Sequence, residues 1–248
     1  MQPQHEYFDP AIYDAEYGGW TGDFNFFCGL KSHGRALDLA CGTGRLTIAL
    51  AQKGLLCTGI DENEKMLSHA KKKSAHLSPN VKIHYAKMDI KHFSFDNPFD
   101  LITLAGNSFQ ALLTEKEQKE MLYCVKTHLK EDGVFAFCTR NPRQADLKTT
   151  KDFEFWHTFT HPSGEDIRVY GRQTYTPKNH LMFYETQRIG KDHTTRTSLT
   201  LRFTAFDALK DLLHSEGLSI IRVYGDFDQT SFDPKQSPDI ILTCRRAG

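Results

Sequence analysis

Short apolar runs alternate with amphipathic stretches through the first part of the chain, starting at Arg35. The apolar runs predict five strands, at residues 36–40, 55–60, 81–85, 99–104 and 133–138. Between them, apolar side chains recur at helical spacing and predict helices at residues 45–53, 63–73 and 115–129. Strands that alternate with helices in this way predict a parallel sheet with helices on both faces.

The hydrophobic pattern changes after residue 145, where apolar and polar residues alternate one by one. Four runs rich in Phe, Tyr, Thr and Val follow each other, at residues 153–159, 167–175, 181–189 and 195–203. Residues typical of turns separate these runs, at 162–164, 177–179 and 190–192. The pattern predicts an antiparallel β meander inserted into the α/β chain.

The α/β pattern resumes after the insertion. Thr204 is predicted to cap a helix that ends at Gly217, and two strands at 218–224 and 239–244 close the sheet. We therefore expect seven strands, mostly parallel, in one domain made of residues 34–145 and 204–248. Residues 146–203 would form the inserted β unit, which could act as a lid over a substrate.

The first 33 residues carry large apolar side chains at roughly helical spacing, interrupted at Gly18 and Gly19. These side chains are Tyr7, Phe8, Ile12, Tyr13, Tyr17 and Trp20. The spacing predicts an N-terminal helical flap over residues 1–33. Aromatic packing into the core is the alternative interpretation.

Charge and composition narrow the choice of partners. Lys plus Arg equals Asp plus Glu at 31 each, so the basic surplus typical of nucleic-acid binding is missing and no nucleic-acid partner is expected. There is no apolar run of about 18 residues, and residues 1–10 lack the apolar core of a signal peptide. We expect a cytoplasmic protein without a membrane span, as a monomer or homodimer.

The six cysteines are scattered, and no two of them are spaced as C-x-x-C. This spacing argues against a zinc site or a redox pair, so the sequence predicts free thiols and no metal.

Three chemical features follow predicted strands, at the edge where parallel sheets bind ligands. The first strand runs into a turn with Gly42 and Gly44, where bare backbone can approach a ligand. Asp61 ends the second strand, and a carboxylate can accept hydrogen bonds from both hydroxyls of a ribose. Asp89 follows the third strand and could bind the amine of an adenine. Each feature alone could be a tight turn or a helix cap.

The spacing of the features indicates an adenosyl cofactor. Asp61 follows Gly44 by 17 residues, close to the interval between a glycine turn and a ribose-binding acid. NAD is the weaker choice, because Thr47 stands where the dinucleotide motif needs a small residue. In addition, Asp38 suits a cationic aminoacyl group better than a pyrophosphate.

These segments carry a resemblance to a known family. Residues 37–45 (Leu-Asp-Leu-Ala-Cys-Gly-Thr-Gly-Arg) resemble the first motif of class I S-adenosylmethionine-dependent methyltransferases, and residues 59–61 (Gly-Ile-Asp) resemble the second. Residues 88–89 and 99–102 are similar to the third and fourth. The resemblance covers about residues 30–145 and 204–246 and implies a Rossmann-like fold. Ala40 departs from it, because the family often has glycine there.

The resemblance implies S-adenosylmethionine as cofactor and assigns roles by position. Asp38 would lie near the methionine ammonium, Asp61 would bind the ribose, and Ala105 would face the methionine. The complete set of implied cofactor-binding residues is Asp38, Ala40, Gly42, Thr43, Gly44, Arg45, Asp61, Glu62, Asn63, Met66, Met88, Asp89, Ile90 and Ala105.

Methyl transfer from a sulfonium needs mainly alignment, which is worth about 7–11 kcal/mol, and no strong base stands out in the sequence. Asn107, just after the fourth strand, is predicted to position the acceptor; capping of the following helix is the alternative. Residues of the insertion could also contact substrate, although sheet packing explains most of them equally well: His157, His161, Tyr170, Arg172 and Tyr175.

Two observations indicate the class of acceptor: the absence of motifs typical of nucleic-acid methyltransferases, and the presence of the β insertion. The Asn/Asp-Pro-Pro-Tyr/Phe signature of nucleic-acid amino methyltransferases is missing after the fourth strand, and no Pro-Cys dipeptide supplies a pyrimidine nucleophile. A β insertion at this point resembles that of glycine and amino-sugar N-methyltransferases. We hypothesise a small-molecule acceptor, methylated on nitrogen or oxygen. An RNA or protein methyltransferase and a non-catalytic cofactor-binding module remain alternatives.

Overall fold

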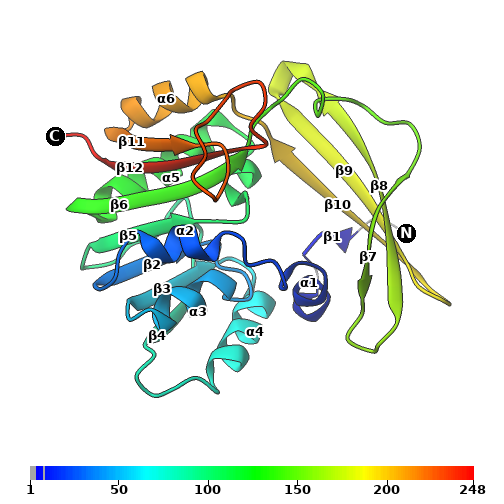
Figure 1. Ribbon diagram of the computed structural model, residues 1–248, viewed down its shortest axis with the longest axis horizontal. Helices are drawn as coiled ribbons and strands as arrows, with labels where there is room; N and C mark the ends of the chain where they lie inside the picture. The colour runs from blue at the N-terminus through cyan, green and yellow to red at the C-terminus, as the bar shows by residue number, and fades with distance from the viewer. Residues whose placement is uncertain (1–3, 8) are drawn as a thin grey trace.

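The structure is a computed structural model, and it describes residues 4–7 and 9–248. Phe8, one of the aromatic residues of the predicted flap, lies outside the described residues. Two sheets stand next to each other, with the short helix α1 (Pro10–Tyr17) between them (Figure 1).

The larger sheet has seven strands in the order β11-β12-β6-β5-β2-β3-β4. Their bounds are β2 (Arg35–Leu39), β3 (Leu56–Asp61), β4 (Ile83–Lys87), β5 (Phe99–Leu104), β6 (Leu129–Arg140), β11 (Leu218–Tyr224) and β12 (Asp239–Arg246). Only β12 runs antiparallel to its neighbours. The predicted Rossmann-like, mostly parallel seven-stranded sheet is confirmed.

Helices cover both faces of this sheet, as predicted. Their bounds are α2 (Phe24–Gly29), α3 (Arg45–Gln52), α4 (Glu64–Ser74), α5 (Glu115–His128) and α6 (Phe206–Ser215), with a 3-10 turn η1 (Ser108–Ala111) after β5. Apolar side chains of α5 and α6 share one buried cluster with strand residues such as Phe137. Those of α2 and α3 share another with the opposite face, around Ala136 and Ile241. None of the helices in 4–7 and 9–248 has the length and apolar character to cross a membrane.

The smaller sheet contains the predicted meander. Its strands are β7 (Glu154–Thr160), β8 (Asp166–Thr176), β9 (Leu181–Ile189) and β10 (Thr194–Arg202), paired antiparallel, with a 3-10 turn η2 (Pro177–Asn179) between β8 and β9. A further strand, β1 (Gln4–His5), pairs parallel with β10. The sequence did not predict β1, because two residues cannot establish a periodic pattern.

The helix before β11 begins differently from the prediction. We expected Thr204 to cap it, but its N-cap residue is Ala205, which has no side-chain cap bond. The Thr204 hydroxyl is instead buried and accepts a hydrogen bond from Gln118 Nε2 at 3.0 Å. The tertiary partner on α5 therefore takes the oxygen that a local cap would have used.

Candidate active site

The turn after β2 has a left-handed backbone at three positions: Ala40 (φ 51°), Gly42 (φ 55°) and Gly44 (φ 78°). A Cβ on Gly44 would lie 2.4 Å from the Tyr85 hydroxyl, so only glycine fits there. A Cβ on Gly42 would meet nothing within 4 Å. The chain thus presents bare backbone to open space at the carboxyl edge of the sheet.

Asp61 connects this turn to the end of β3. Its Oδ2 accepts a hydrogen bond from the Gly42 N–H at 2.9 Å, and its Oδ1 accepts one from the Asn63 N–H at 2.8 Å. Burial raises the pKa of Asp61, and these two bonds offset part of the rise. A carboxylate has about four acceptor positions, so two remain for a ligand.

The residues after Asp61 differ in how accessible they are. Asn63 caps α4 through its Oδ1, and its Nδ2 donates to the Tyr7 carbonyl oxygen at 3.2 Å. Met66 is buried, whereas Glu62 is exposed. Asn63 therefore links the N-terminal segment to the predicted cofactor edge.

The residues predicted to frame the adenine follow the end of β4. Asp89 accepts a hydrogen bond from the Lys91 N–H at 2.8 Å and pairs with Lys91 Nζ at 3.1 Å. Met88 and Ile90 are half-buried against the core cluster of the sheet. Ala105, after β5, is also half-buried, against the cluster on the other face.

Asp38 is buried inside the sheet edge. Its Oδ2 accepts a hydrogen bond from the Thr47 hydroxyl at 2.6 Å, and its Oδ1 accepts one from the Thr103 hydroxyl at 2.9 Å. Burial raises the pKa of Asp38 to about 6, although both hydroxyls favour the charged form. Thr47, which argued against NAD in the sequence, is thus a partner of the carboxyl.

This raised pKa predicts a pH-dependent stability. Between about pH 4 and pH 6 the folded chain keeps a proton on Asp38 that the unfolded chain has released. The free energy of unfolding should therefore fall by about 2 kcal/mol as the pH rises through this window. Asp38→Asn, which lacks the titrating group, should show a flatter dependence in denaturant unfolding between about pH 4 and pH 8. Equal slopes for both proteins would contradict the prediction.

Thr43 and Arg45 hold the N-terminal segment against the turn. The Thr43 hydroxyl donates to Asp14 Oδ1 at 2.5 Å, and Lys73 Nζ lies 2.8 Å from Asp14 Oδ2. Arg45 makes two hydrogen bonds of 2.7 Å to Asp23, which is fully buried. Asp14 and Asp23 could not be predicted from the sequence, because nothing local in the chain indicates their partners.

A second polar group lies at the carboxyl end of β6. Arg140 is exposed, and Asp239 is its direct partner in the antiparallel pairing of β6 with β12. Burial raises the pKa of Asp239, of Tyr184 on β9 and of Tyr7, and the positive charge of Arg140 offsets part of the rise in each. The charge of Arg140 therefore affects side chains of the larger sheet, the smaller sheet and the N-terminal segment. Neither Arg140 nor Asp239 stands out as a site residue in the sequence.

The smaller sheet contributes aromatic side chains near this cation. Trp156 contacts Tyr184, with ring centroids 6.1 Å apart, and it lies over Gly171, where a Cβ would be 2.0 Å from its ring. The polar residues that the sequence singled out in the insertion are engaged elsewhere. His157 contacts Glu16, His161 contacts Ser163, Tyr170 packs on Phe155, Arg172 pairs with Glu185, and Tyr175 contacts His180.

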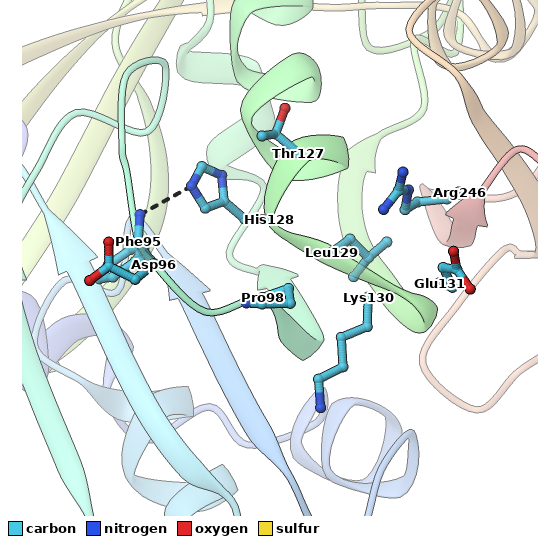
Figure 2. Close-up of a pocket in the computed structure, with 9 residues that line it drawn as sticks. All are labelled: Phe95, Asp96, Pro98, Thr127, His128, Leu129, Lys130, Glu131 and Arg246. Atoms are coloured by element: carbon cyan, nitrogen blue, oxygen red, sulfur yellow. Dashed lines mark hydrogen bonds between the residues drawn. The ribbon is translucent and has the colours of Figure 1, made fainter.

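A cavity of about 410 Å³ opens at the other edge of the larger sheet, where β5 and β6 begin (Figure 2). His128 uses both ring nitrogens there, with the Phe95 N–H at 3.1 Å and the Cys124 carbonyl at 2.8 Å. Lys130 points away from Arg246 in Figure 2 and pairs with Asp100 at 2.8 Å. His128 and Lys130 thus have their polar partners within the protein. Within the described part of the chain, no group of three or more acidic, His or Cys side chains could hold a metal ion.

The segment that carries the glycine turn and Asp61 is similar to known proteins. The family described as "methyltransferase domain" matches residues 36–133, from β2 into β6. The predicted resemblance to the S-adenosylmethionine-dependent methyltransferases is confirmed. The predicted enzyme class and the predicted cofactor are thereby confirmed, and NAD-dependent oxidoreduction is set aside.

Relatives of this methyltransferase align over most of its length. It is 28% identical over 233 residues to YqeM of Bacillus subtilis (strain 168), which has a provisional methyltransferase name; the match covers 90% of this chain and 88% of that one. It is 28% identical over 212 residues to a glycine/sarcosine N-methyltransferase of Aphanothece halophytica, with 84% and 76% covered. A solved S-adenosylmethionine-dependent methyltransferase of Clostridium acetobutylicum ATCC 824 shares the fold, with a TM-score of 0.77, 23% identity, and 96% and 97% covered.

Proposed function

We propose that this methyltransferase acts on the nitrogen of a small amine that also carries a carboxylate group. The observation that carries the proposal is Arg140, an exposed cation at the carboxyl end of β6. A guanidinium pairs with a carboxylate through two parallel hydrogen bonds. Glycine and sarcosine, named in the relative from Aphanothece halophytica, are amines of this kind.

The strand ends suit the cofactor. Asp61 has acceptor positions left for the ribose hydroxyls, and the open space at Gly42 leaves room for the ligand against bare backbone. We assign the adenine to the half-buried Met88 and Ile90 and to Asp89, and the methionine ammonium to the side of Asp38. When bound, S-adenosylmethionine supplies a methyl group whose bond to sulfur breaks as the nitrogen lone pair bonds to the carbon.

The chain's own residues would then align the acceptor and exclude water. Arg140 would hold the carboxylate of the acceptor, and Asn107 would lie at its nitrogen. We assign the roof of this space to the insertion, through Trp156 and Tyr184. We assign its closure to the N-terminal residues 4–7 and 9–33. Alignment of this kind can account for much of the rate without a strong base.

An acceptor screen tests the proposal. The chain, supplied with methyl-labelled S-adenosylmethionine, should methylate glycine or sarcosine but not the matching amines without a carboxylate. Arg140→Met should raise the KM for the acceptor about tenfold or more, because it removes charge-assisted hydrogen bonds. Arg143→Met is the matched control, since Arg143 pairs with Asp146 at 2.6 Å. Transfer to RNA or protein alone would contradict the proposal.

A further inference from the structure

Trp156 stands at a β-bulge, where β7 has one residue more than the strand it pairs with. Phe155 pairs with Tyr170 of β8 and His157 pairs with Val169, so Trp156 has no partner of its own. A bulge interrupts the alternation of side chains along a strand and can turn one of them to a new side. Phe155 lies against Tyr170, with ring centroids 5.6 Å apart, and this pair marks the opposite face from that of His157 and Val169.

Gly171 shows which face Trp156 covers. A Cβ on Gly171 would lie 2.0 Å from the Trp156 ring, so the indole lies directly over this glycine. Gly171 is two residues from Val169 and therefore shares its face, which is also the face of His157. The indole contacts the Tyr184 ring at an interplanar angle of 75°, and it is still 40% exposed. A large ring that neighbours hold in place and leave uncovered is available to a ligand.

Helix α1 lies on one side of this ring. His157, next to Trp156, contacts Glu16 of α1 through its Nε2 at 3.0 Å. Asp14, two residues before Glu16, accepts a hydrogen bond from the Thr43 hydroxyl in the glycine turn. Helix α1, which lies between the two sheets in Figure 1, therefore connects the neighbour of Trp156 to the turn proposed for the cofactor.

The segment that leaves β6 lies on the other side of the ring. Gln173, two residues after Gly171 and on the same face, donates through Nε2 to the carbonyl oxygens of Asp146 and Lys148, at 3.0 and 2.9 Å. This segment follows Arg140, the last residue of β6 and the cation proposed to bind the carboxylate of the acceptor. The exposed indole thus lies between α1 and this segment, over the space assigned to the acceptor.

Methyl transfer places a positive charge on the acceptor nitrogen. The nitrogen lone pair bonds to the methyl carbon, the electron pair of the broken bond stays on sulfur, and the charge passes from sulfur to nitrogen. A primary or secondary amine then loses a proton to water, whereas a tertiary amine keeps the charge. The face of an indole ring attracts a cation more strongly than the face of any other aromatic side chain.

Asn107 offers the acceptor nitrogen a different contact. Its side chain makes no cap bond to η1, so the alternative that it caps the next helix is wrong. Its Oδ1 is buried and accepts no hydrogen bond from the described residues. An amide oxygen binds an N–H, and a nitrogen whose hydrogens are all replaced has none. A ring face needs no N–H, so Trp156 can hold the nitrogen at every stage of methylation.

We propose that Trp156 is a specificity-determining residue: its exposed indole ring contacts the acceptor nitrogen, so that amines which already carry methyl groups are preferred. This inference rests on the proposed N-methyltransferase function. It extends the acceptors from glycine to its N-methylated forms, up to dimethylglycine, whose product is a quaternary ammonium.

Two molecules of the same shape test the contact without turnover. Trimethylglycine carries the cation, and tert-butylacetate has carbon in place of the nitrogen. Calorimetric titration of the chain with S-adenosylhomocysteine bound should give a Kd about 2- to 30-fold lower for trimethylglycine. Trp156→Leu should abolish this difference and Trp156→Phe should keep part of it. Phe155→Leu, the adjacent ring on the opposite face, is the matched control and should keep it in full. Equal affinities in the wild-type chain, or an unchanged ratio in Trp156→Leu, would overturn the proposal.

Turnover of an acceptor series provides a second measurement. The wild-type chain should have a higher kcat/KM for dimethylglycine than for glycine, and Trp156→Leu should lower this ratio about threefold or more. Gly171→Ala should lower it as well, because its Cβ displaces the ring. Adding Gly171→Ala to Trp156→Leu should change the ratio no further, since the displaced ring is absent. A preference for glycine in the wild-type chain, or effects that multiply in the double variant, would contradict the role of Trp156.

Wild-type turnover separates the two proposals. If the chain methylates none of these amines, the proposed function fails and this inference fails with it. If the chain methylates them and Trp156→Leu leaves both ratios unchanged, only the role of Trp156 fails.

Discussion

Arg188→Met is expected to lower the free energy of unfolding by about 3–5 kcal/mol, because it leaves two buried carboxylates without their cation. The Arg188 side chain on β9 is 5% exposed, and its Nε donates to Glu16 Oε2 at 2.7 Å. It also pairs with Glu6 and donates to the Thr197 hydroxyl at 2.8 Å. Glu16 is fully buried in this cluster, and its other oxygen contacts the His157 ring nitrogen at 3.0 Å.

Denaturant unfolding of the wild-type chain and the variant measures this effect. Arg172→Met is the matched control on the neighbouring strand, because Arg172 pairs with Glu185 at 2.6 Å while it is 40% exposed. An exposed pair of this kind contributes at most about 1 kcal/mol. Adding Glu16→Gln to Arg188→Met should recover part of the loss. A loss no larger than that of Arg172→Met would show that the cluster is not needed for stability.

Asp61→Ala is expected to weaken the binding of S-adenosylmethionine and of S-adenosylhomocysteine about 10- to 150-fold. The variant removes the acceptors proposed for the ribose hydroxyls, and charge-assisted hydrogen bonds contribute about 1.5–3 kcal/mol. It also frees the Gly42 N–H and the Asn63 N–H, which hold the turn in place. Both ligands carry the same ribose, so both should lose affinity to the same extent.

Calorimetric titration with the two ligands measures the change. Glu64→Gln is the control, because Glu64 stands close in the sequence but its side chain is 80% exposed. Asp61→Asn should also bind weakly, since one end of its amide would present N–H groups to a backbone N–H. Unchanged affinity in Asp61→Ala would remove Asp61 from the cofactor site.

The sequence was sufficient for the parts of the fold that depend on local patterns. Apolar runs and alternation located the strands of both sheets except β1, because burial of one or both strand faces leaves a period that can be read directly. The glycine turn and Asp61 were also found, since both stand at strand ends where motif and spacing agree. The structure brings them together through the hydrogen bond from Gly42 to Asp61.

The acceptor side could not be predicted in the same way. Arg140 and Asp239 meet only because β12 inserts antiparallel beside β6, and that register has no local signal. The failure at Thr204 has the same origin, since Gln118 is distant in the sequence. Asp14 and Asp23 were missed because isolated acids in a polar segment usually remain on the surface.

Helix α1 has only eight residues, and two of its acidic side chains bond to different parts of the protein. Asp14 bonds to Thr43 and Lys73 of the larger sheet's domain, whereas Glu16 bonds to Arg188 of the smaller sheet. Residues two apart on a helix point about 200° away from each other, so the two acids leave α1 on opposite sides. Helix α1 thus links the two sheets through side chains on its opposite faces. An inserted residue between these acids would rotate one anchor by about 100°, so this segment tolerates changes of sequence better than changes of length.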